Sequence, residues 1–177
     1  MDEKDRFAVK DYFRTLTRLW FSPGQFFREL PETPRVGQPL SFLLLSSFIA
    51  AAGTFLYVPA CTLLMAAVVF INAASMPFIA SAFGYLVMTL MRGEQAGYGR
   101  LFRVYAFASG ATLPLAWLPS SLWFTETWKW VLIGIGLVKG CGLRPLQATA
   151  VIAFSVLLLV LFFWSLGPVI LWMKGGA

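Results

Sequence analysis

The chain has 177 residues, of which 59% are hydrophobic and 12% charged, with a formal net charge of +6 and a mean hydropathy of +0.75. Soluble domains carry about 25% charged residues, so this composition indicates an integral membrane protein. The chain has no His and only two Cys, Cys61 and Cys141, which is too few for a zinc, haem or iron–sulfur site, so no metal or cofactor is expected. The basic residues flank apolar runs, a position that favours lipid headgroups over nucleic acid as their partner.

Residues 1–36 are polar and charged, which predicts a cytoplasmic tail ahead of a membrane domain over residues 37–177. The tail does not have the short basic stretch and apolar core of a cleavable signal peptide. Its apolar residues recur at intervals of three and four, and its basic residues at intervals of four, which predicts an amphipathic helix lying on the membrane. A second short helix is expected from Pro23 to Pro31. The positions that define the first helix include the apolar Tyr12, Phe13, Leu16 and Trp20 and the basic Lys10, Arg14 and Arg18.

Five apolar segments follow the tail, which predicts an all-α integral membrane protein with a five-span helical bundle. A helix needs about 20 apolar residues to cross the hydrocarbon core of a bilayer. The second segment is longer than a straight crossing requires, and Pro77 in its middle predicts a kink. The predicted spans are residues 38–58, 60–91, 101–119, 121–138 and 146–172.

Lys and Arg are distributed unequally between the two ends of these spans. Twelve of the 14 lie in the tail or in the loops after the second and fourth spans, and only Lys129 and Lys174 lie at the other end. Because cytoplasmic loops are rich in Lys and Arg, we expect the amino terminus in the cytoplasm and the carboxyl terminus outside. Four tryptophans then gather near the outer face, as in an interfacial belt: Trp117, Trp123, Trp128 and Trp172.

Few strongly polar side chains lie within the predicted spans. Asn72, near the middle of the second span, is expected either to bond to a neighbouring helix or to contact a solute or lipid. Glu126 and Lys129 are spaced i, i+3 on the fourth span, so they can pair on one face near the outer headgroups. The same pair could also gate a transport path, because ionisable groups within a span are functional candidates. The sequence has no His base, no paired acids in one span and no Gly-x-Ser-x-Gly motif, so an enzyme is not expected.

Three stretches resemble the Ypt-interacting protein (Yip) domain family in its bacterial branch. The resemblance implies a small helical protein of the bacterial cytoplasmic membrane without known catalytic residues. Eukaryotic members are linked to vesicle traffic and Rab-class GTPases, but this tail does not contain the Asp-Leu-Tyr-Gly-Pro sequence tied to that role, so GTPase binding is not expected. The stretches are residues 19–27 (LWFSPGQFF), 97–109 (GYGRLFRVYAFAS) and 128–137 (WKWVLIGIGL).

The sequence leads to two hypotheses about function. The first is a non-enzymatic scaffold or adaptor that binds another membrane complex or organises the lipid around it. Its tail helices either only anchor the first span or dock a partner or curved lipid. The second is a permease, or the membrane subunit of a transporter, for an apolar or lipid-like solute. The first hypothesis relies on a cytoplasmic basic patch of Arg92, Arg100, Arg103, Lys139 and Arg144.

Overall fold

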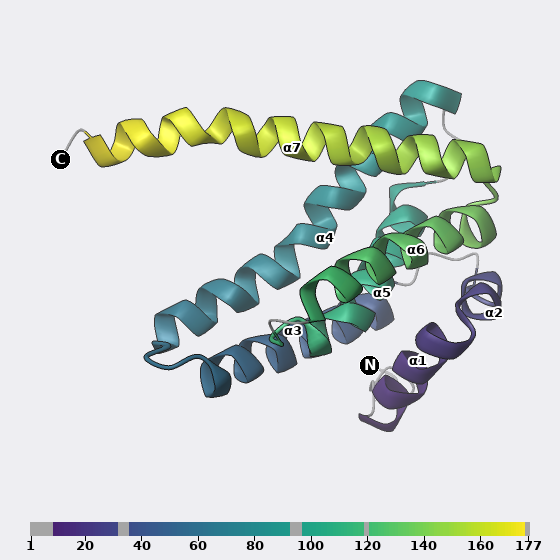
Figure 1. The fold of residues 1–177 in the computed structure, drawn as a ribbon. Helices are drawn as coiled ribbons and strands as arrows, with labels where there is room; N and C mark the ends of the chain where they lie inside the picture. The colour runs from purple at the N-terminus through teal and green to yellow at the C-terminus, as the bar shows by residue number, and fades with distance from the viewer. Residues whose placement is uncertain (1–8, 32–35, 93–96, 119–120, 176–177) are drawn as a thin grey trace.

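The structure is a computed structural model that describes residues 9–31, 36–92, 97–118 and 121–175, and over these ranges the chain is helical. Two short helices, α1 (Val9–Phe21) and α2 (Pro23–Arg28), precede the long helices α3 (Gly37–Tyr57) and α4 (Leu63–Arg92). They are followed by α5 (Tyr98–Thr112), the 3-10 turn η2 (Leu113–Leu115), α6 (Leu122–Gly140) and α7 (Pro145–Gly175). The all-helical prediction is confirmed for the described residues. The long helices run back and forth across the molecule, and the carboxyl-terminal half of α7 extends beyond the others (Figure 1).

The turn between α6 and α7 has a clear physical origin. After α6, the N–H of Leu143 bonds to the carbonyl oxygen of Leu137, and Gly142 adopts a positive φ of 71°. This is the usual way to close a helix, because glycine enters the left-handed region without steric cost. Pro77 lies inside α4, which continues on both sides of it, so the predicted kink stays a prediction.

Within the described residues, three helices are long and apolar enough to cross a membrane: Gly37–Tyr57, Leu63–Met91 and Pro145–Phe162. They correspond to the first, second and fifth predicted spans. The third predicted span corresponds to α5 and η2. The 15 residues of α5 form a helix only about 22 Å long, which is shorter than the roughly 30 Å thickness of a hydrocarbon core. The fourth is realised as α6, which carries Glu126, Lys129 and Lys139. The helices of the five predicted spans are therefore present, and three of them qualify as membrane crossings.

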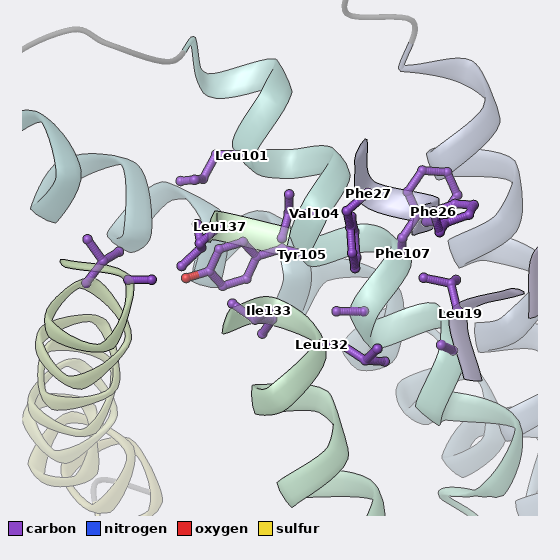
Figure 2. Packing of buried hydrophobic residues seen from close by; sticks show 14 of the residues in the cluster. Leu19, Phe26, Phe27, Leu101, Val104, Tyr105, Phe107, Leu132, Ile133 and Leu137 are labelled. Carbon is purple, nitrogen blue, oxygen red and sulfur yellow. The ribbon is translucent and has the colours of Figure 1, made fainter. Parts of the chain in front are cut away.

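The short helix α5 lies at the centre of the molecule. Its residues from Leu101 to Ala108 are all buried, and it packs against α3, α4 and α6. Figure 2 shows the side chains of this core, where Tyr105 lies beside Leu137 and Ile133, and Phe107 beside Phe26. Aromatic side chains contribute strongly to such a core, because each buries about 150–250 Å².

Glycines allow the helices around α5 to approach closely. A Cβ at Gly84 of α4 would lie 2.7 Å from the Tyr105 hydroxyl, and one at Gly110 of α5 would lie 2.7 Å from the Phe42 ring. A Cβ at Gly136 of α6 would lie 2.4 Å from Val104 Cγ1. Each of these contacts places a large or branched side chain directly against a helix backbone, as in small-residue packing of membrane helices.

The two tail helices belong to this packed core. Tyr12 is 1% exposed and Leu19 is fully buried, and on α2 Phe26 and Phe27 are buried against α5 and α6. We expected the apolar face of the tail helix to rest on lipid, but the structure buries it against protein. An amphipathic pattern requires only that the apolar face be removed from water. Here that face packs against α3, α5 and α6.

Candidate functional site

Three of the predicted patch residues lie at the end of the molecule where α6 turns into α7. Lys139 and Arg144 are exposed on either side of that turn, and Arg100 is half-buried near the start of α5. The side chain of Arg92 is outside the described part of the chain. The described patch is therefore a basic rim formed by Arg100, Lys139 and Arg144.

Arg103, the remaining patch residue, is not part of this surface. It is 2% exposed, and its Nη1 donates a hydrogen bond to the carbonyl oxygen of Pro31 at 2.6 Å. Because Pro31 follows α2 closely, the guanidinium holds the end of the tail against α5. The prediction that Arg103 contacts a partner at the surface is therefore wrong, since a buried side chain cannot be part of a docking face.

Cys141 lies next to the rim, and its thiol is expected to be unreactive. Burial raises the pKa of its thiol from 9.0 to about 11, although the positive charges of Arg100 and Arg103 act in the opposite direction. The thiol is therefore protonated and weakly nucleophilic at neutral pH. Cys141 therefore acts as a packing residue in this structure.

The predicted tail residues are divided between the inside and the outside of the molecule. The Tyr12 hydroxyl lies 3.0 Å from the Ser46 hydroxyl of α3, and Trp20 Nε1 donates to the carbonyl oxygen of Ala111 at 3.0 Å. Arg18 forms an ion pair with Glu29, and its guanidinium lies 5.9 Å from the centre of the Phe26 ring, so it joins α1 to α2. Leu16 packs partly buried against the core.

The remaining predicted tail residues lie on the outer side of α1. Phe13 is 59% exposed and Phe21 is 83% exposed. Phe21 lies on the side of α1 opposite the buried Tyr12 and Leu19, and the Phe13 ring lies edge-on to the Tyr12 ring, with 5.5 Å between the ring centroids. Phe21 was not among the residues that the sequence singled out. Its spacing of seven from Arg14 was the signal, because that spacing places the two on one helix face. We define the α1 outer face as the exposed residues Lys10, Phe13, Arg14, Thr17 and Phe21.

The polar residues of the predicted spans have different surroundings. Lys129 Nζ donates to Glu126 Oε1 at 2.7 Å, which confirms the predicted pairing. Trp128, expected in an interfacial belt, is partly buried, and its ring lies parallel to that of Phe124, with ring planes 3° apart and centroids 6.5 Å apart. The belt itself stays a prediction. The side chain of Trp172 lies outside the described residues.

Asn72 does not lie between helices, because its side chain is exposed on α4. The expectation that it bonds across a helix interface is therefore wrong. One turn further along α4, Met76 faces α7 across an apolar groove of about 450 Å³. The groove is also lined by Leu159, Val160 and Trp164 of α7 and is open at the side.

The chain has a clear family relationship. The model of the Yip1 domain matches residues 17–167, from the end of α1 to the second half of α7. No curated protein and no solved structure shows a significant match to the chain. The matched region includes the core around α5, the basic rim and most of the three apolar helices. With those helices, the chain is an integral membrane protein that belongs to the Yip1 domain family.

Proposed function

We propose that this protein is a non-enzymatic membrane scaffold that binds another membrane protein through the basic rim of Arg100, Lys139 and Arg144. The observation that carries the proposal is the exposure of Lys139 and Arg144 on both sides of the tight turn after α6. Because the turn is fixed by Gly142 and by the Leu143 to Leu137 bond, the two cations are presented from a rigid base. Membership of a membrane family that is not known for catalysis supports a binding role.

The proposal includes five membrane crossings with the amino terminus in the cytoplasm and the carboxyl terminus outside. Three crossings are the apolar helices α3, α4 and α7. We assign α5 with η2 and α6 as the other two. Helix α5 is buried among its neighbours and so needs less apolar surface of its own, and α6 exposes the apolar side chains of Trp123, Phe124 and Val131. This arrangement is supported by the Lys and Arg residues that lie between the second and third crossings and between the fourth and fifth, which it places on the cytoplasmic side: Arg92, Arg100, Arg103, Lys139 and Arg144. The rim then faces the cytoplasm in the membrane of a bacterial cell.

Charge reversal of the two exposed rim residues tests this proposal. We expect Lys139→Glu combined with Arg144→Glu to remove a protein partner that co-purifies with the full chain in mild detergent, because like charges across an interface oppose binding. Lys139→Arg combined with Arg144→Lys is the matched control, since it changes the same two side chains and keeps their charge. The measurement is quantitative mass spectrometry of the co-purified proteins. A partner that remains bound to the double variant, or a protein that purifies alone, contradicts the scaffold.

The apolar groove between α4 and α7 favours the alternative of a lipid-like solute. Its lining of Met76, Leu159, Val160 and Trp164 would suit an acyl chain and no ion. Purified protein in phospholipid vesicles distinguishes the two functions by the rate of lipid movement between leaflets. A scaffold predicts the rate of protein-free vesicles. A faster rate that falls when Leu159→Trp fills the groove would support the alternative.

A further inference from the structure

The charged helix α1 lies level with the middle of a membrane-crossing helix. Its Tyr12 contacts Ser46, which is about 14 Å from the start of α3 and about 17 Å from its end along the helix axis. At its other end, Trp20 bonds to Ala111 and lies 6.0 Å from the ring of Trp128. Gly110, the residue before Ala111, packs against Phe42 and Ser46 of α3, so the Trp20 end of α1 lies at the same level as the Tyr12 end, away from the ends of α3.

The side of α1 that faces away from the bundle combines positive charge with aromatic surface. Lys10, Phe13, Arg14, Thr17 and Phe21 are all exposed, and their spacing of three and four residues places them in one stripe. Phe124 of α6 extends the aromatic surface, because it is 55% exposed and its ring centre lies 5.9 Å from that of Trp20. This α1 outer face occupies the level where the bilayer around α3 is hydrocarbon.

Neither lipid nor water suits this face. Lys10 and Arg14 lie within two residues of Tyr12, so their side chains cannot reach across half of a hydrocarbon core, about 15 Å, to the headgroups. Water would solvate the charges but would leave Phe13 and Phe21 exposed, which is unfavourable for large apolar side chains. A mixture of aromatic residues with Arg at the centre of a face is typical of protein interfaces.

We propose that the α1 outer face binds a second membrane protein, different from this chain, that places carboxylates against Lys10 and Arg14 and apolar side chains against Phe13 and Phe21. A second copy of this chain does not fit. Of the described acidic residues, Asp11 is exposed on α1 beside these cations, whereas Glu29 is paired with Arg18 and Glu126 with Lys129. Two copies in contact through this face would therefore bring four cations, Lys10 and Arg14 of each copy, against only the two Asp11 carboxylates. This surface lies on another part of the molecule from the basic rim and does not depend on the function proposed for the rim.

Cysteine reporters test whether a protein covers the face. Thr17→Cys places a thiol at its centre without changing its charge. Thr149→Cys, exposed near the start of α7, is the reporter for water, and Val68→Cys, exposed on α4, is the reporter for lipid. The unaltered chain gives the background labelling of Cys61 and Cys141. The probe is a water-soluble maleimide, applied to the full chain in native membranes and after purification in detergent.

We expect Thr17→Cys to label at least about tenfold more slowly in native membranes than in detergent, relative to Thr149→Cys. Adding Lys10→Glu and Arg14→Glu should remove this protection, whereas Lys10→Arg with Arg14→Lys should keep it. A photoreactive benzoylphenylalanine at position 13 should form an adduct with another protein in the same membranes. This adduct should disappear when Lys10 and Arg14 are both replaced by Glu and should remain when their charges are kept.

Three results overturn the proposal. Labelling of Thr17→Cys as fast as that of Thr149→Cys in native membranes means that the face is open to water. The face meets the bilayer if position 13 forms adducts with phospholipid alone and Thr17→Cys labels at the same rate as Val68→Cys. In that case reversing the charges at positions 10 and 14 would not change the labelling rate. Adducts between two copies of the chain mean that the occupant is a second copy. Loss of the rim's partner in the Lys139 and Arg144 variant has no bearing on these measurements.

Discussion

Replacing Gly136 by Ala is expected to destabilise the protein more than any other single added methyl group on α6. The new Cβ would lie 2.4 Å from Val104 Cγ1 and 3.2 Å from Phe27 Cε1, and both neighbours are buried. Val104 is β-branched and fixed in the central helix, so it cannot rotate away without disturbing α5. Overpacking of this kind costs about 1–3 kcal/mol, which should lower the melting temperature of the detergent-solubilised protein clearly.

A matched control lies two residues away on the same helix. A Cβ at Gly134 would lie 3.6 Å from Ile152 Cδ1, an ordinary contact, and Ala is a better helix former than Gly by up to about 1 kcal/mol. Gly134→Ala should therefore leave the melting temperature unchanged or raise it. Combining Gly136→Ala with Val104→Ala should recover part of the loss by removing the clash. Equal stability of the two single glycine variants would contradict the close approach of α6 to α5.

Replacing Arg103 by Met is the second substitution with a large expected effect. Met preserves much of the volume but removes the charge-assisted bond from Nη1 to the Pro31 carbonyl oxygen. Loss of a hydrogen bond to a charged group costs about 1.5–3 kcal/mol. Because that bond holds the segment after α2, we expect both a lower melting temperature and faster chymotrypsin cleavage at the Phe residues of α2.

Arg144→Met is the control for Arg103→Met, because Arg144 is exposed and its replacement should change stability by no more than about 0.5 kcal/mol. The pair also separates two roles for Arg103. If Arg103→Met keeps the parental melting temperature and loses a bound partner, Arg103 works at a surface, and the buried position described above is contradicted.

The positions of the long helices could be predicted from the sequence because apolar length is a local property. The predicted span 38–58 corresponds to α3 (Gly37–Tyr57), and the predicted span 121–138 to α6 (Leu122–Gly140). The bond between Glu126 and Lys129 could be predicted as well, since a spacing of three residues fixes their separation on any helix.

The surroundings of a helix face could not be predicted in this way. The pattern that includes Tyr12, Leu16 and Trp20 shows that one face of α1 avoids water, but lipid and protein satisfy it equally. Arg103 resembles its neighbour Arg100 in the sequence, yet only the packing of α2 against α5 determines that Arg103 is buried. The depth of Asn72 in its span leaves open whether it bonds to a neighbouring helix or contacts a solute or lipid. The rotation of α4, which exposes the Asn72 side chain, cannot be predicted from depth.

The central claim is that the charged tail helix α1 is part of the bundle at the depth of the middle of α3. Benzoylphenylalanine at position 20, in the full chain in native membranes, tests it most directly, because it replaces an aromatic side chain that contacts Ala111, Phe124 and Trp128. Peptide mapping by mass spectrometry after illumination should find an adduct within the same chain, joining position 20 to residues 107–128. Adducts with phospholipid and none with that segment would place α1 on the membrane surface and contradict the account.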